Sequence, residues 1–187
     1  MSRTDGTVLR DKRSRKIVVV AHCILNQNAR VSGLANHAGM IDELAKLLLK
    51  KHYGVVQMRC PELIYGGLKR WSQTKEQYDT PMFRKLCREI AKSVTEQVKE
   101  YLDGGVKVAL VIGVEGSPSC GVNETSKGYF GGIVEGTGEQ KSESVKGSGI
   151  LIEELRSELN RMKISIPFYG IKHTSLHNDI RTLDRML

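Results

Sequence analysis

The sequence predicts an α/β fold, with a single domain built on a doubly wound, mostly parallel sheet. Two observations carry this prediction. Short apolar runs of strand length alternate with longer segments of helical periodicity, and the connections between strands are long enough for crossover helices. With 187 residues, 40% of them hydrophobic, the chain can bury one core without disulfides. No internal repeat or linker divides it, so we expect one Rossmann-like domain.

The first part of the chain indicates a strand, a helix and a second strand. Residues 17–22 form an apolar run rich in β-branched side chains, which is typical of a central parallel strand. After a polar loop at 26–36, apolar residues recur at helical spacing between positions 40 and 52. Gly54 interrupts that pattern, and residues 55–58 indicate a second strand.

A long helix and a third strand follow. Asp79-Thr80-Pro81 combines a capping side chain with a first-turn proline, and the apolar stripe behind it continues to Leu102. Gly104-Gly105 ends this helix, and residues 106–113 form the next strand-like run.

The last part of the chain opens with a glycine-rich stretch at 113–149. That stretch is too long for an ordinary connection, so we expect it to contain a hairpin or a loop that covers a site. Beyond it, the apolar pattern predicts a helix at 151–162, a strand at 164–169 and a closing helix at 176–187.

The chain is basic, with 29 Lys and Arg against 21 Asp and Glu and a net charge of +8. Half of this excess lies in residues 1–16, where six basic side chains accompany two acidic ones. We therefore expect a disordered basic tail at 1–16, ahead of the α/β domain at 17–187. For such a tail, a solvating role is favoured over a nucleic-acid-binding arm.

We expect a cytoplasmic protein with no membrane partner. The basic start and the apolar run behind it resemble a secretory signal, but His22 interrupts the run and no small-residue cleavage site follows. No apolar run approaches the ~20 residues that a membrane span needs. Four cysteines in 187 residues are also too few for a secreted disulfide scaffold.

Three of the four cysteines, Cys23, Cys60 and Cys120, lie just beyond predicted strands or in the loops that these strands feed. Open α/β sheets bind ligands outside the carboxyl ends of their strands. The three thiols can therefore converge at one site, although no CxxC motif links them. Cys87 instead lies on the apolar stripe of its helix, where we expect a small buried packing residue.

Three converging thiolates would suit an iron–sulfur cluster with an open position. Structural zinc sites and most iron–sulfur clusters take four protein ligands. When only three cysteines bind a four-iron cluster, one iron has no protein ligand and can bind a substrate atom as a Lewis acid. A soft iron of this kind is matched to sulfur.

The residues beside these cysteines can supply proton-transfer groups. Glu62 follows Cys60 by two positions and can move protons near a metal. Ser117 and Ser119 place two hydroxyls beside Cys120, and the neighbouring glycines allow close backbone approach. Taken singly, each residue has an ordinary explanation as a helix cap, a surface acid or a turn former.

Three ordered segments carry a family resemblance: His22-Cys23-Ile24-Leu25 with Arg30, Cys60-Pro61-Glu62-Leu63, and Ser117-Pro118-Ser119-Cys120-Gly121. Over about residues 17–172 the chain resembles the DUF523 family, which includes the thiouracil desulfidases. Residues 60–87 are similar to the desulfidase-related branch of this 2-thiouracil desulfurase family. The chain departs from it in one place, because many relatives have Arg-Tyr-Asp-Gly where Arg30-Val31-Ser32-Gly33 stands here.

The resemblance implies an enzyme, a desulfidase whose [4Fe-4S] cluster is held by Cys23, Cys60 and Cys120 only. It places the catalytic carboxylate on Glu62 and the catalytic hydroxyl on Ser117. The implied reaction is non-redox: the open iron takes sulfur from a thiolated pyrimidine base or nucleotide, water replaces it on carbon, and hydrosulfide leaves. Glu62 would relay protons, and Ser117 would position the water or the substrate.

We expect the substrate to contact Ser119, Arg30 and Trp71. Trp71 lies in a predicted loop at 65–78, where aromatic and basic residues alternate. This combination suits a stacked base with a nearby phosphate, although aromatic side chains that pin a loop to the core give the same pattern. The partner would be a small thiolated nucleobase or a thiolated RNA nucleotide.

Two other functions fit the same residues. A metal-stabilised RNA-binding module without turnover would use the basic tail and the loop around Trp71. A metal-free cysteine hydrolase would pair Cys120 with His22, although no acidic residue that could orient the histidine is evident.

Overall fold

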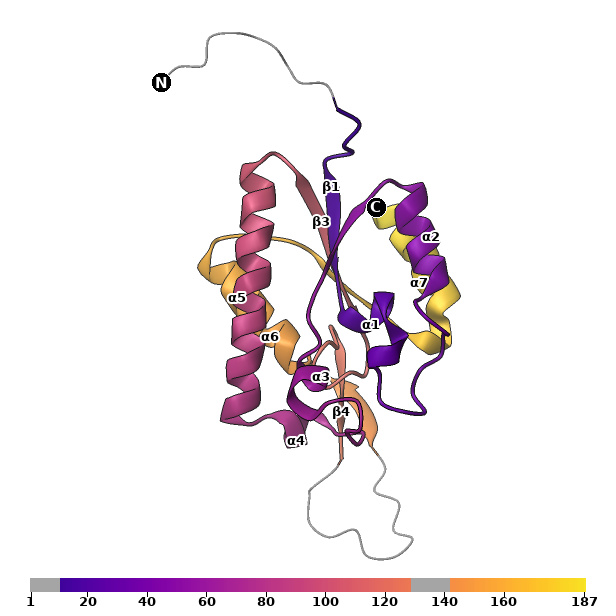
Figure 1. The fold of residues 1–187 in the computed structure, drawn as a ribbon, viewed down its shortest axis with the longest axis vertical. Coiled ribbons are helices and arrows are strands. Elements are labelled where there is room, and N and C mark those ends of the chain that lie inside the picture. The colour runs from indigo at the N-terminus through magenta and orange to yellow at the C-terminus, as the bar shows by residue number, and fades with distance from the viewer. Residues whose placement is uncertain (1–10, 129–141) are drawn as a thin grey trace, which may run out of the picture.

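The protein is built around one parallel sheet (Figure 1). The computed structural model describes residues 11–128 and 142–187. Within them, four strands are hydrogen-bonded in the order β2-β1-β3-β6, and each neighbouring pair is parallel. Their bounds are Lys16–Val20 for β1, Gly54–Gln57 for β2, Lys107–Val114 for β3 and Phe168–Ile171 for β6.

Helices cover both faces of this sheet. The α-helices are α1 His22–Leu25, α2 Asp42–Lys50, α3 Pro61–Gly66, α4 Lys75–Tyr78, α5 Pro81–Asp103, α6 Ile150–Arg161 and α7 Leu176–Met186. Two short 3-10 helices are η1 Gln27–Ala29 and η2 His173–Ser175. In Figure 1, α5 and α6 pack together on one side of the sheet, while α2 and α7 pack on the other. The predicted α/β fold with a doubly wound sheet is therefore confirmed.

The core lies around β1, which has a strand on each side. Val18, Val19 and Val20 of this strand are fully buried. Because both faces of a parallel sheet are covered by helices, its central strand carries apolar side chains at consecutive positions instead of alternating with polar ones. The prediction of a central strand from this run is confirmed.

The helix α5 begins and ends where the sequence predicts. The hydroxyl of Thr80 accepts a hydrogen bond from the Phe83 amide at 3.2 Å, Pro81 occupies the first turn, and Gly104 follows the last residue. Cys87 points into the core and is fully buried, which confirms its interpretation as a packing residue.

A two-stranded antiparallel sheet stands apart from the main one. It pairs β4 Glu124–Lys127 with β5 Glu143–Lys146. The hairpin expected within 113–149 is confirmed by these two strands, and residues 129–141 between them lie outside the described residues.

The predicted strand at 164–169 is wrong in its bounds, because β6 starts at Phe168. Pro167 directly precedes it and has no amide to donate, so only its carbonyl joins the ladder, accepting from the Val111 amide at 3.0 Å. The first strand is also shorter than predicted: β1 ends at Val20, and α1 begins at His22.

The segment 65–78, predicted as a loop, also contains helix. It includes the end of α3 and the whole of α4. A capping box starts α4, where the side-chain oxygen of Gln77 accepts a hydrogen bond from the Thr74 amide at 3.0 Å. Four-residue helices give too little periodicity to be recognised from apolar spacing.

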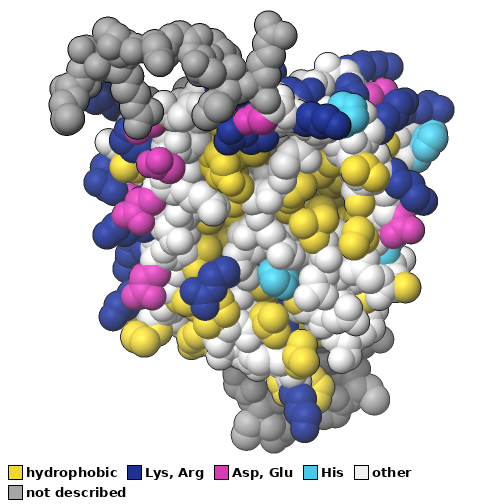
Figure 2. Space-filling view, turned by 45° about the horizontal axis from the view of Figure 1, so that its top comes forward, with side chains coloured by type: hydrophobic (Ala, Val, Ile, Leu, Met, Phe, Trp, Pro, Cys, Tyr) yellow, Lys and Arg dark blue, Asp and Glu magenta, His cyan; other side chains and the backbone are white. Residues whose placement is uncertain are grey.

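The surface shows how the basic charge is distributed. On the face drawn in Figure 2, Lys and Arg side chains lie mainly along the edges, while hydrophobic side chains occupy the middle. Residues 11–15 of the expected tail are exposed and have no regular structure, and residues 1–10 lie outside the described part. The division into a tail at 1–16 and a domain at 17–187 stays a prediction. Within the described ranges, no helix is both long and apolar enough to span a membrane.

Candidate functional site

Three cysteines from three strand ends line one cavity of about 260 Å³. Cys23 lies in α1, directly after β1. Cys60 precedes the first residue of α3 after β2, and its sulfur accepts a hydrogen bond from the Leu63 amide at 3.4 Å. Cys120 lies in the loop that follows β3. The sheet order puts β1 between β2 and β3, so the three loops meet at the same edge.

Cys120 is buried, Cys23 and Cys60 are partly buried, and the three thiols influence one another's pKa values. The pKa of Cys23 is raised to about 12, mainly by burial; the charge of Arg30 lowers it, and the nearby Cys60 contributes a smaller increase. Burial likewise raises the pKa of Cys120 well above its usual range, and Cys60 and Cys23 add to that effect. Deprotonating all three thiols therefore requires a strong compensating positive charge, which a bound metal group supplies.

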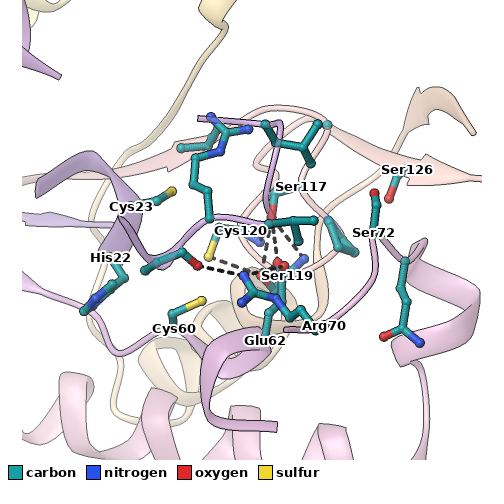
Figure 3. A pocket seen from close by; sticks show the side chains of 18 of the residues that line it. His22, Cys23, Cys60, Glu62, Arg70, Ser72, Ser117, Ser119, Cys120 and Ser126 are labelled. Carbon is teal, nitrogen blue, oxygen red and sulfur yellow. Dashed lines mark hydrogen bonds and ion pairs between the residues drawn. The ribbon is translucent and has the colours of Figure 1, made fainter. Parts of the chain in front are cut away.

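The three thiols are the donor set that a metal group at this site would use. Among residues 11–128 and 142–187, no three His, Cys, Asp or Glu side chains lie close enough together to hold a single metal ion. In an iron–sulfur cluster separate irons bind separate thiolates, so its cysteine ligands need to face one cavity. The side chains of Cys23, Cys60 and Cys120 border the same cavity in Figure 3, so the donor set fits such a cluster.

Glu62 and two serine hydroxyls form a hydrogen-bonded chain on the cavity wall. The hydroxyl of Ser119 donates to Oε1 of Glu62 at 2.5 Å, and that of Ser117 donates to the same oxygen at 3.3 Å. The two hydroxyl oxygens also lie 3.3 Å apart. Figure 3 shows this chain beside Cys120. A carboxylate and two hydroxyls so arranged can accept, hold and return a proton.

Arg70 forms an ion pair with the other oxygen of the Glu62 carboxylate. Its Nη2 lies 3.7 Å from Oε2 of Glu62, and its side chain is only 4% exposed. The same guanidinium donates to the carbonyl oxygens of Ala29 at 2.8 Å and Gly67 at 2.9 Å. It therefore ties the segment after Cys23 to the end of α3. Sequence reasoning missed this role, because no spacing rule links an arginine in an irregular segment to Glu62.

The loop that carries Ser117, Ser119 and Cys120 is closed tightly on itself. The hydroxyl of Ser117 accepts hydrogen bonds from the amides of Ser119 at 3.3 Å and Cys120 at 3.0 Å. A Cβ at Gly121 would stand 2.0 Å from the carbonyl oxygen of Glu124, and one at Gly113 would stand 2.2 Å from that of Cys120. Only glycine fits at these two positions.

Arg30 also lines the cavity, where it meets a histidine from the end of the chain. Its Nη1 donates to Nε2 of His173, in the 3-10 helix η2. Burial and, to a smaller extent, the charge of Arg30 together lower the pKa of His173 from 6.5 to about 4. The imidazole is therefore neutral near pH 7 and can accept the guanidinium's hydrogen bond.

The structure brings most of the expected site residues together, but not all of them. Cys23, Cys60, Cys120, Glu62, Ser117, Ser119 and Arg30 all line the cavity. Trp71 does not, and its side chain is 85% exposed, although its neighbours Arg70 and Ser72 are part of the wall. Where many relatives have Tyr-Asp, Val31 lines the cavity and Ser32 is exposed.

The pairing that a cysteine hydrolase would need is not formed. Within the described residues, the polar side-chain group that contacts the Cys120 thiol is the Ser119 hydroxyl, at 3.5 Å. The ring of His22 points away from Cys120 in Figure 3. The raised pKa of Cys120 also leaves it as a neutral thiol when no metal is bound, whereas a nucleophilic cysteine needs a lowered pKa.

Comparison with known proteins identifies the same family that the three cysteine motifs resemble. The model of the 2-thiouracil desulfurase family matches residues 18–165. An uncharacterised protein of Methanocaldococcus jannaschii is 33% identical over 177 residues, which cover 94% of this chain and 99% of that protein. The solved structure of the [4Fe-4S]-dependent thiouracil desulfidase TudS superposes with a TM-score of 0.48 and 22% identity, covering 91% of this chain and 99% of the other. The family match spans most of the chain, and the chain therefore belongs to the 2-thiouracil desulfurase family.

Proposed function

We propose that the protein is an iron–sulfur-dependent desulfidase, which removes sulfur as hydrosulfide from a thiolated pyrimidine base or nucleotide without net oxidation or reduction. The observation that carries this proposal is the chain from Ser117 and Ser119 to Glu62 on the wall of a cavity lined by three cysteines. Membership of the 2-thiouracil desulfurase family supports it.

Cys23, Cys60 and Cys120 would hold a [4Fe-4S] cluster. Their sulfurs come from three separate strand ends, are largely removed from water and face one cavity. When bound, such a cluster supplies an iron without a protein ligand, which acts as a soft Lewis acid towards a thiocarbonyl sulfur.

Glu62 is the general base and acid of the reaction. It takes one proton from the water that attacks the thiocarbonyl carbon and gives it to the departing sulfur, while the second proton of that water passes to solvent as the carbonyl forms, so that C=S and H₂O become C=O, HS⁻ and H⁺. The hydroxyls of Ser117 and Ser119 fix Oε1 of Glu62 and offer a place for the water. Arg70 fixes the carboxylate from the other side.

Ser119 and Arg30 are the proposed substrate contacts inside the cavity. Both line it, and Arg30 presents a guanidinium whose partner, His173, is neutral. At about 260 Å³ the cavity is small for a binding site, so a nucleotide would place its base inside and its sugar and phosphate outside. Trp71 stands next to the wall residues Arg70 and Ser72, where it could stack on the outer part of a nucleotide.

The test is a product assay under anaerobic conditions. Iron-loaded protein is incubated with 2-thiouracil or 4-thiouracil, and uracil and sulfide are both quantified. Equal amounts of uracil and sulfide, with neither formed by iron-free protein, are the expected result. Sulfide formed only when an external reductant is consumed would overturn the non-redox reaction. Comparison with thiouridine monophosphate and a thiolated RNA then ranks the substrates by kcat/KM.

One observation favours a second candidate, a metal-stabilised module that binds RNA without turnover. The Trp71 indole is 85% exposed and follows Lys69 and Arg70 in the sequence, and aromatic residues beside basic ones suit single-stranded nucleic acid. Such a module would bind RNA with steep salt dependence and release no sulfide. Its affinity would fall in the Trp71→Ala variant and would not change in the Glu62→Gln variant.

A further inference from the structure

Glu115 is a carboxylate beside the site that the proposed reaction does not use. It directly follows the last residue of β3, and two residues later the chain reaches Ser117. We propose that Glu115 is a positioning residue, whose carboxylate clamps the turn at 122–124 and thereby fixes the loop that carries Ser117, Ser119 and Cys120. Its effect on turnover rests on the function proposed above, whereas its effect on the loop does not.

The carboxylate accepts three consecutive backbone amides. Its Oε2 accepts from the amides of Val122 at 3.2 Å, Asn123 at 3.0 Å and Glu124 at 2.8 Å. Its Oε1 accepts from the side-chain amide of Asn123 at 2.8 Å. Hydrogen bonds from amides to an ionised carboxylate are stronger than those to a neutral acceptor, and successive amides that converge on one point favour an anion.

These contacts join the two ends of the loop. At the first end, the amide of Glu115 donates to the Ile171 carbonyl at 2.9 Å, which anchors it to β6. At the second end are the three clamped amides, and the Gly116 amide donates to the Glu124 carbonyl at 3.0 Å. The loop between them is therefore closed by Glu115 through its backbone on one side and its side chain on the other.

The neighbouring strand leaves space for this carboxylate. Gly170 in β6 is paired with Gly113 in β3, and a Cβ at Gly170 would stand 1.9 Å from Oε1 of Glu115. A side chain there would have to displace the carboxylate from its amides. The clamp thus depends on two residues 55 positions apart, and each can be changed separately.

The loop is the part of the site where position matters most. It supplies Cys120 to the cavity and both hydroxyls that bind Oε1 of Glu62. A displacement of about 1 Å of such groups can lower a rate about 100-fold. The Glu115 carboxylate is occupied by hydrogen bonds from backbone amides. It therefore acts on the reaction through Ser117, Ser119 and Cys120 and does not need to touch the substrate.

The test compares Glu115→Gln and Gly170→Ala with two matched controls, Glu100→Gln and Gly39→Ala. Glutamine keeps the shape of the side chain but removes its charge and turns an NH₂ group towards the amides. Glu100 is an exposed residue of α5, and a Cβ at Gly39 would meet nothing within 4 Å. The first readout is amide hydrogen exchange at residues 122–124. The second is alkylation by iodoacetamide at each cysteine of the full chain without iron.

In both clamp variants, exchange at 122–124 should become faster, and alkylation of Cys120 should rise by about threefold or more relative to Cys23 and Cys60, which lie on other elements. In iron-loaded protein, kcat per bound cluster should fall ~10- to 100-fold with KM changed less than about threefold.

The two control variants should match the wild type in every readout. Unchanged exchange and unchanged Cys120 labelling in both clamp variants would overturn the proposal. These two readouts do not require any desulfidase activity, so failure of the proposed function would be recognised separately.

Discussion

The hydroxyl of Ser119 donates a hydrogen bond of 2.5 Å to Oε1 of Glu62, although 57 residues separate the two in sequence. One residue lies at the start of α3, after β2, and the other in the loop after β3. The parallel sheet places these two loops on either side of the one that follows β1, which carries Cys23. Proton-transfer groups and thiols therefore converge at one sheet edge before any substrate is bound.

Glu62→Gln should remove the proton-transfer step and leave the thiols in place. We expect kcat for sulfide release to fall ~100- to 10,000-fold, the range by which general acid–base groups accelerate reactions. Iron content should not change, because Glu62 is not among the proposed ligands. The control is Glu100→Gln on the exposed face of α5, which should keep wild-type kcat. A Glu62→Gln variant with wild-type kcat would rule out Glu62 as the base.

The two serines should differ in effect. Ser119→Ala removes the 2.5 Å hydrogen bond to Glu62 and should lower kcat by ~10- to 100-fold, since a hydrogen bond to a charged group contributes about 1.5–3 kcal/mol. Ser117 also accepts from the Cys120 amide at 3.0 Å, so Ser117→Ala should lower both kcat and iron retention. Iron per chain and kcat per iron separate these effects. The same iron loss in both variants would contradict the distinction.

Arg70→Met should destabilise the fold. The arginine side chain is 4% exposed and that of Glu62 is 14% exposed, so the substitution leaves a largely buried carboxylate without its positive partner and two carbonyls without this hydrogen-bond donor. Breaking a buried pair in this way costs about 3 kcal/mol of the free energy of unfolding, measured by urea denaturation. The control is Arg161→Met, whose pair with Glu158 lies on the surface and contributes less than about 1 kcal/mol. Equal losses in the two variants would contradict the account.

His173 should make the fold sensitive to acid. Its pKa is lowered from 6.5 to about 4 by burial and by Arg30, so the folded state binds its proton less readily than the unfolded state. The resulting loss of stability begins as the pH falls below about 6.5 and is complete below about 4. Urea denaturation at several pH values should show a steeper decline for the wild type than for His173→Gln over that range. Parallel declines would contradict the assignment.

The sheet and the long helices could be predicted from the sequence because their patterns are local. The β-branched run before His22 and the capped apolar stripe of α5 each identify an element without outside information. The short elements could not be predicted in this way. The helices α3 and α4 are set by Pro61 and by a capping box, and the start of β6 is set by Pro167.

Part of the site also follows from sequence, because cysteines that follow parallel strands must gather at one edge of the sheet. The contacts that hold the site do not follow. Arg70 reaches Glu62 from an irregular segment, and Glu115 reaches amides that come after the loop it supports. Trp71 resembles a site residue in sequence but lies outside the cavity, because neighbouring residues of an irregular segment can point in different directions.

The most direct test of the proposed cluster is anaerobic reconstitution followed by an absorption spectrum and by iron and sulfide quantitation. Wild-type protein and the Cys87→Ala variant should be brown and contain about four iron and four sulfide ions per chain. Alanine at Cys23, Cys60 or Cys120 should abolish this content, because each would remove one of only three ligands. A colourless wild-type protein that contains stoichiometric zinc, or one whose iron depends on Cys87, would contradict the proposed site.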